Sequence, residues 1–144
     1  MTKPVNVEAE KAAIRRVIAS NIGWAATKDT TLLYSTVAHD DDFFYFSPSD
    51  AGNIRGYKDF VNLTENFFLL DEFQAVDYQL RDLYIGVSKS GEAAWFHTRL
   101  DDHNLWKGRP ANWDNARWSG VLEKRDGRWV IVQMHFSFAT DAEK

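Results

Sequence analysis

The sequence predicts an α+β domain in which a strongly curved antiparallel sheet wraps around about three helices, a cone-shaped half-barrel. Two observations predict this fold. Helical periodicity dominates the stretch 7–69, and four alternating apolar and polar stretches follow, at about 73–87, 92–106, 112–124 and 128–138. These strands would reach roughly 11 to 15 residues, where about 5 to 6 is usual. Because strands of that length twist and coil, the sheet should curl and offer a concave face to the helices.

The first half supplies the helices. A first helix, from residue 7 to about 27, would bury one face formed by Val7, Ile14, Val17, Ile18, Ile22 and Ala25. Asp29 or Thr30 can cap a second, shorter helix. A third helix should run from residue 57 to about 69. Between the second and third helices, residues 43–46 have strand composition, and residues 53–55 form a short strand that pairs back.

Length and composition fit one domain at 7–138, between tails at 1–6 and 139–144. The net charge of −4, without a Lys/Arg cluster, argues against a nucleic-acid partner. No stretch approaches the roughly 18 apolar residues of a membrane span, so no membrane partner is expected. The beginning of the sequence lacks the pattern of a secretory signal, which makes a cytoplasmic location the expectation.

Several kinds of chemistry are not expected. The chain has no cysteine, which excludes disulfides and thiolate metal sites. No metal site is expected at His39-Asp40-Asp41-Asp42, because consecutive residues cannot all face one ion. No Gly-rich phosphate loop or dinucleotide fingerprint occurs, so no cofactor is expected.

The last hairpin admits two registers. A three-residue loop with a bulge would place the even positions of 128–138, which include Met134 and Phe136, on one inward face with Trp118, and a two-residue loop would not. We favour the bulged register because it makes one continuous apolar face. The opposite, convex face is then too apolar to remain in water, and we expect it to bury against a second copy in a homodimer. The predicted interface residues are Arg117, Trp129, Ile131 and His135.

The strand at 92–106 has two usable faces. Its even positions, from Ala94 to Leu100, suit a core, while its odd positions carry Trp95, His97, Arg99 and Asp101. If the odd face lines a pocket, His97 would be a general acid or base. Asp101 would orient His97 or be the acid or base itself. Arg99 would stabilise developing negative charge. The alternative is an outward face whose charges pair across strands. The sequence leaves both open.

Aromatic residues make up 15% of the chain, more than the packing of three short helices demands. Several of them should therefore line a cavity for a small organic ligand. The candidates for the wall of this pocket, with one methionine among them, are Trp24, Tyr34, Tyr45, Phe46, Trp95, Trp118, Met134 and Phe136.

Three segments carry a resemblance to a known family: Gly56-Tyr57-Lys58-Asp59-Phe60, Arg117-Trp118-Ser119-Gly120-Val121-Leu122, and a Trp-x-Ile-x-x-x-His-x-Ser pattern at 129–137 after a glycine turn. The chain resembles the nuclear transport factor 2-like superfamily, especially its SnoaL-like branch, from about residue 7 to 138. The resemblance implies a cone-shaped, usually dimeric fold with a deep pocket. Relatives include isomerases, polyketide cyclases, dehydratases and pure binding or assembly modules.

The chain also resembles the association domain of calcium/calmodulin-dependent kinase II. One pocket arginine of that domain would fall on Arg99. Its other pocket arginines fall on Gly120 and Phe136, so its anion-binding cluster is not reproduced.

Three functions remain open on the sequence. We favour a dimeric small-molecule-binding domain whose aromatic pocket takes a flat or apolar organic ligand. The second is a cofactor-independent acid/base enzyme of the isomerase, cyclase or dehydratase type that uses His97, Arg99 and Asp101. The third is an oligomeric assembly module that acts through its convex face.

Overall fold

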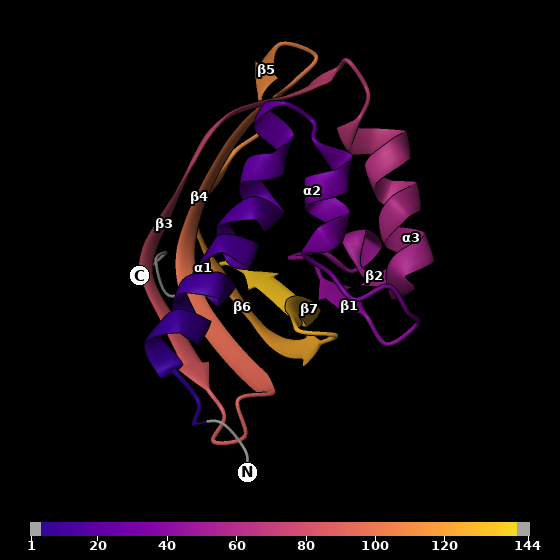
Figure 1. The fold of residues 1–144 in the computed structure, drawn as a ribbon. Helices are drawn as coiled ribbons and strands as arrows, with labels where there is room; N and C mark the ends of the chain where they lie inside the picture. The colour runs from indigo at the N-terminus through magenta and orange to yellow at the C-terminus, as the bar shows by residue number, and fades with distance from the viewer. Residues whose placement is uncertain (1–3, 141–144) are drawn as a thin grey trace.

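A curved seven-stranded sheet holds the helices in its concave face (Figure 1) in the computed structural model, which describes residues 4–140. The helices are α1 (Val7–Gly23), α2 (Thr30–Ser35) and α3 (Gly56–Leu63), with short 3-10 turns at Trp24–Ala26 and Asp50–Gly52. One π-helical turn, Thr64–Phe68, continues α3. The strands are β1 (Phe44–Phe46), β2 (Ile54–Arg55), β3 (Phe73–Val87), β4 (Ala93–Trp106), β5 (Arg109–Pro110), β6 (Trp113–Arg125) and β7 (Arg128–Ser137).

Side-chain caps set the helix starts. The Asn6 side chain accepts a hydrogen bond from the Ala9 N–H at 3.1 Å, so α1 begins at Val7. Asp29, one of the two predicted caps of the second helix, accepts from the Leu32 N–H at 3.1 Å. Residues 1–3 and 141–144 of the predicted tails lie outside the described residues.

The sheet is mixed, whereas the sequence predicted an antiparallel one. The strand order is β2-β1-β7-β6-β4-β3, with β5 paired to β4. The four long strands form the predicted antiparallel meander, but β1 pairs in parallel with β7, Tyr45 opposite Met134. This parallel pairing is possible because α3 and three long strands separate β1 from β7 in the chain, which provides the crossover that parallel neighbours need.

The bulge in the last hairpin lies within the strands and not at the turn, so the three-residue loop that we favoured from the sequence is wrong. The turn is a two-residue one, Asp126-Gly127, and both of its residues have positive φ, 53° and 77°. Further along, Val121 pairs with Gln133 while Leu122 pairs with Ile131, so one residue of β7 is left over.

The position of this bulge overturns part of the predicted dimer interface. The extra residue switches the alternation of β7, so that Trp129 and Ile131 face inward before the bulge and Met134 and Phe136 face inward after it. Trp129 is 4% exposed and Ile131 is fully buried. The prediction that both contact a second copy is therefore wrong, because their own subunit covers them. Arg117, by contrast, lies on the outer face of the sheet.

The two faces of β4 also differ in burial. The even positions Ala94, Phe96, Thr98 and Leu100 are all buried. The odd positions face outward, and Trp95 is 46% exposed. The convex outer side of the sheet therefore carries the row of charged and imidazole side chains.

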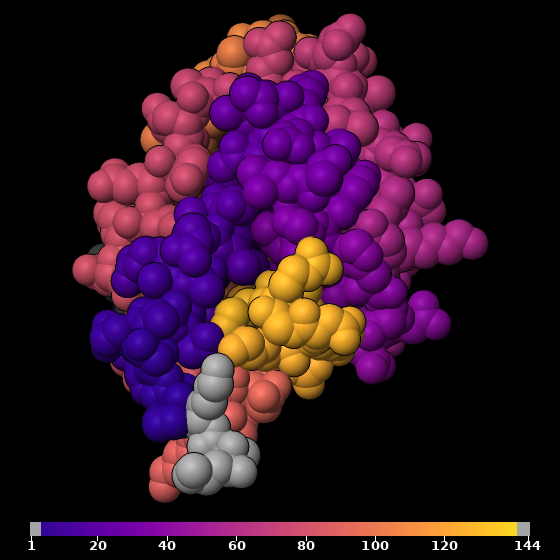
Figure 2. Space-filling model, in the orientation of Figure 1, coloured from indigo at the N-terminus to yellow at the C-terminus, as the bar shows by residue number. Residues whose placement is uncertain are grey.

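The helices cover the concave side of the sheet, and Figure 2 shows α1 and α2 packed side by side over it. Ile14 and Ile18 of α1 and Leu33 of α2 fill the space between the layers. No helix within residues 4–140 combines the length and the apolar character that crossing a membrane requires.

Candidate functional site

A cavity of about 520 Å³ lies between the concave face of the sheet and the helices. Eight of its eighteen lining residues are aromatic, and the rings come from the turn after α1, from α3 and its π-helical turn, and from four strands. The wall includes Trp24, Tyr45, Phe60, Phe67, Phe68, Phe73, Trp113 and Phe136. The domain is thus hollow on the inner side of its sheet.

The predicted pocket residues divide into two groups. Trp24, Met134 and Phe136 line the cavity, as does Tyr45. The other four do not line it, each for a structural reason that follows.

Trp118 is 1% exposed and stacks on Phe136, with ring centroids 5.2 Å apart, so it supports the cavity wall from behind. Tyr34 packs edge-on against Tyr57, away from the cavity. Phe46 and Trp95 are 40% and 46% exposed on the outer side of the sheet.

One end of the cavity is polar. Asp102 and Asn104 continue the inward row of β4, and Asn112 follows from the connection to β6. The Asn112 side chain accepts a hydrogen bond from the Asn104 N–H at 2.9 Å, and the Ala111 N–H donates to the Asn104 carbonyl at 2.8 Å. These bonds tie the loop at the cavity rim to β4.

Asp102 provides the one carboxyl among the described lining residues. Burial raises its pKa above the ordinary value, opposed by a hydrogen bond from Asn104 and by the nearby His103. It forms no ion pair with another described residue. The pKa of the Tyr45 hydroxyl is also raised, first by burial and then by the charge of Asp102. A carboxyl of this kind can accept a hydrogen bond or a proton from a bound molecule.

The predicted catalytic residues His97, Arg99 and Asp101 do not face this cavity. Asp101 forms a bidentate ion pair with Arg81, with N···O distances of 2.8 and 3.2 Å. It also accepts a hydrogen bond from the Asn115 N–H at 2.8 Å. The Asn115 N–H and then Arg81 lower the pKa of Asp101. These contacts hold the Asp101 carboxylate on the outer face.

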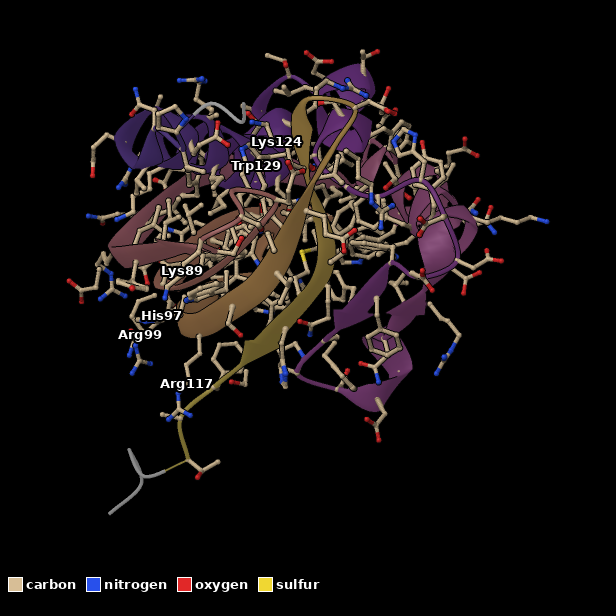
Figure 3. All side chains as sticks on the ribbon, turned by 60° about the horizontal axis from the view of Figure 1, so that its bottom comes forward. Lys89, His97, Arg99, Arg117, Lys124 and Trp129 are labelled. Carbon is tan, nitrogen blue, oxygen red and sulfur yellow. The ribbon has the colours of Figure 1, made fainter. Side chains whose placement is uncertain are left out.

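His97 and Arg99 line a second, more open hollow of about 540 Å³ on the outer face, which we call the outer groove. Figure 3 shows His97, Arg99 and Arg117 on the side of the sheet opposite to Trp129. The His97 ring stacks on Tyr84, with centroids 5.2 Å apart. His135 and Ser137 complete the outer groove from β7.

A histidine bridge spans three strands close to the cavity. His103 Nδ1 lies 2.7 Å from Asp77 Oδ1, and its Nε2 lies 2.8 Å from Asp114 Oδ1. The two carboxylates, Asp114 before Asp77, raise the pKa of His103 above its usual value. Within residues 4–140, no His, Asp and Glu side chains group in a way that could hold a metal ion.

We expect this bridge to make stability fall as the pH rises. Because the folded-state pKa of His103 is raised, its contribution is complete below the unfolded-state value of about 6.5 and is lost as the pH passes the folded-state pKa. His103→Gln should flatten the unfolding free energy over that window, measured by urea denaturation at several pH values. An unchanged pH profile in the variant would show that the bridge does not contribute.

A curved sheet that encloses helices and a lined cavity on its concave side defines the cone-shaped nuclear transport factor 2-like class. The chain belongs to the SnoaL-like domain family, whose model matches residues 14–141. No curated protein matches the chain.

Solved structures share the fold at low sequence identity. A nuclear transport factor 2-like superfamily protein from Salmonella enterica serovar Typhimurium is 21% identical with a TM-score of 0.72, over 93% of this chain and 95% of that one. The association domain of Caenorhabditis elegans CaMKII is 20% identical with a TM-score of 0.67, over 91% and 97%. A type 2 hexachlorocyclohexane dehydrochlorinase is 17% identical with a TM-score of 0.69, over 90% and 85%.

Proposed function

We propose that the protein binds a flat, largely apolar organic molecule in the cavity, with Asp102 as its polar anchor. The observation that carries the proposal is an aromatic cavity of about 520 Å³ with one carboxyl among its described lining residues. Ligand sites of about 300 to 1,000 Å³ with apolar walls and few polar groups are typical of small-molecule binding. A flat ligand with a hydroxyl or another hydrogen-bond donor at one end could pack against the aromatic side chains and donate a hydrogen bond to Asp102.

The proposal predicts that 2-naphthol binds more tightly than naphthalene in isothermal titration calorimetry. Both rings can contact the aromatic wall, but only the naphthol hydroxyl can donate to Asp102. Ala111→Phe, at the exposed rim of the cavity, should weaken 2-naphthol binding by about tenfold or more, equivalent to about 1.4 kcal/mol. Ala12→Phe is the matched control, because Ala12 is exposed on α1 away from the cavity.

Two results would contradict cavity binding. One is that neither naphthalene nor 2-naphthol binds the wild-type protein. The other is that Ala12→Phe weakens binding as much as Ala111→Phe, since binding would then not take place at the rim.

A second candidate function is cofactor-independent acid/base catalysis at the same cavity, and Asp102 favours it. A half-buried carboxyl with a raised pKa has the property that general acid/base catalysis needs. A dehydrochlorinase among the proteins of this fold is compatible with such chemistry. In this candidate Asp102 takes the role that the sequence assigned to His97 and Asp101, because those two side chains face away from the cavity.

We also infer a homodimer, and the exposed apolar side chains of the outer face support it. Tyr84, Trp95 and Val121 are 51%, 46% and 39% exposed there, and Arg117 and His135 lie beside them. An association domain is among the similar structures, which is also compatible with an assembly role. We expect Trp95→Glu to shift the protein to monomer in sedimentation velocity, and a wild-type monomer at micromolar concentration would contradict the inference. The cytoplasmic location stays a prediction.

A further inference from the structure

The outer groove contains two arginines that lie opposite each other on neighbouring strands and form no ion pair with any described residue. Arg99 of β4 pairs in register with Arg117 of β6, and on its other side with Arg81 of β3. Arg81 is neutralised by Asp101, whereas neither Arg99 nor Arg117 forms an ion pair with any described residue. Like charges directly opposite each other destabilise a sheet, so an anion bound between the two arginines would relieve a repulsion.

Arg99 also has a donor that lacks a partner. Its Nη1 atom is buried and forms no hydrogen bond with the described residues. A buried donor left unpaired carries its full desolvation cost, and the cost is higher for a charged group. The missing acceptor at Arg99 is therefore the second, independent indication that the outer groove is built to receive an anion.

The remaining lining residues of the outer groove are mostly hydrogen-bonding groups. His97 pairs in register with Ser119, and Ser119 pairs with His135, which forms one row across three strands. Ser137 pairs with Arg117 and extends the arginine row. Three hydroxyl side chains, including that of Thr98, and two imidazoles thus line the groove with the two guanidinium groups, and Asp82 is the one carboxylate among the described lining residues.

We propose that the outer groove binds a phosphate group, held by Arg99 and Arg117 with hydroxyl and imidazole groups around it. A phosphate near neutral pH carries close to two negative charges and three acceptor oxygens, which match two guanidinium groups and donors from three strands. The groove volume of about 540 Å³ leaves room for an organic residue attached to the phosphate. This site lies across the sheet from the cavity and is separate from the proposed cavity function. It shares Arg117 and His135 with the outer face through which we infer a homodimer, and sedimentation velocity distinguishes the two occupants.

The test is isothermal titration calorimetry with inorganic phosphate, and with acetate at the same ionic strength as the comparison anion. We expect wild-type protein to bind phosphate and to bind acetate more weakly. Arg99→Gln and Arg117→Gln should each weaken phosphate binding by about tenfold or more, since charge-assisted hydrogen bonds are lost. Arg128→Gln is the matched control: it removes the same charge from an exposed position at the start of β7, outside the groove, and should bind as wild type does.

A thermal melt separates this role from a folding defect. Without phosphate, Arg99→Gln should melt at or above the wild-type temperature, because the substitution removes a like-charge contact. Added phosphate should raise the melting temperature of wild type but not of the variant.

The proposal is overturned if phosphate does not bind wild type, if acetate binds as well as phosphate, or if Arg128→Gln weakens binding equally. It is also overturned if phosphate does not bind and Arg99→Gln converts a dimer to monomer in sedimentation velocity. In that case a second copy occupies the outer groove.

Discussion

Trp118→Ala should lower the free energy of unfolding by about 3–5 kcal/mol, measured by urea denaturation. Trp118 is 1% exposed and contacts Phe96 edge-on and Phe136 face to face, with centroids 5.1 and 5.2 Å away. Removal of the indole would leave a void behind the cavity wall that these two rings cannot fill. Trp118→Phe should cost less, because it keeps most of the ring and removes an indole N–H that is buried without a partner.

Trp95→Ala is the matched control, since Trp95 lies on the neighbouring strand but points outward. We expect Trp95→Ala to cost less than about 1 kcal/mol in the monomer. Any larger loss should depend on protein concentration, because it would report self-association through the outer face. Equal, concentration-independent losses in Trp118→Ala and Trp95→Ala would contradict the assignment of the two faces.

The sequence predicts the architecture well because long alternating strands leave few ways to bury their apolar faces. The cap at Asp29 follows from local chemistry that tertiary contacts do not override. The parallel partner β1 is harder to predict, since three residues carry no information about the direction in which they pair.

The register of β7 shows where sequence reasoning fails. From Trp129 to Val132 every residue is apolar, so both alternation patterns fit, and the bulge opposite Val121 and Leu122 carries no glycine to mark it. The side-chain parity changes at this bulge, which is why Trp129 and Ile131 turn inward. Only the pairing with β6 determines this parity, and pairing is a tertiary property.

Asp102, the carboxyl that lines the cavity, was not among the site residues predicted from the sequence, although the sequence contained a signal for it. The even-numbered positions of 92–106 have core composition from Ala94 to Leu100. The next two even-numbered positions are Asp102 and Asn104. Polar residues that continue an apolar row indicate a polar end of a cavity. The more conspicuous cluster of His97, Arg99 and Asp101 lies on the opposite face, where charges can be solvated or paired.

Asp102→Asn should raise stability at neutral pH while it removes the acid/base group of the cavity. Because burial raises the folded-state pKa of Asp102, its contribution to stability is complete below the unfolded-state value of about 3.9 and is lost as the pH rises through the folded-state pKa. Ionisation of this half-buried carboxyl therefore costs stability above the unfolded-state pKa, and the neutral amide avoids that cost. We expect a higher melting temperature for the variant near pH 7 and no difference at low pH. If the second candidate function is correct, turnover should fall by about 100-fold or more in this variant.

Asp101→Asn is the matched control, and its stability should change in the opposite direction. The pKa of Asp101 is lowered by the Asn115 N–H and Arg81, so its contribution is present above the unfolded-state pKa and is lost as the pH falls through the folded-state value. Asp101→Asn should therefore melt below wild type at neutral pH, and the deficit should shrink in acid. Two adjacent aspartates would thus change stability in opposite directions, because one faces an apolar cavity and the other an arginine. The same direction of change in both variants would show that the inward and outward rows of β4 are assigned incorrectly.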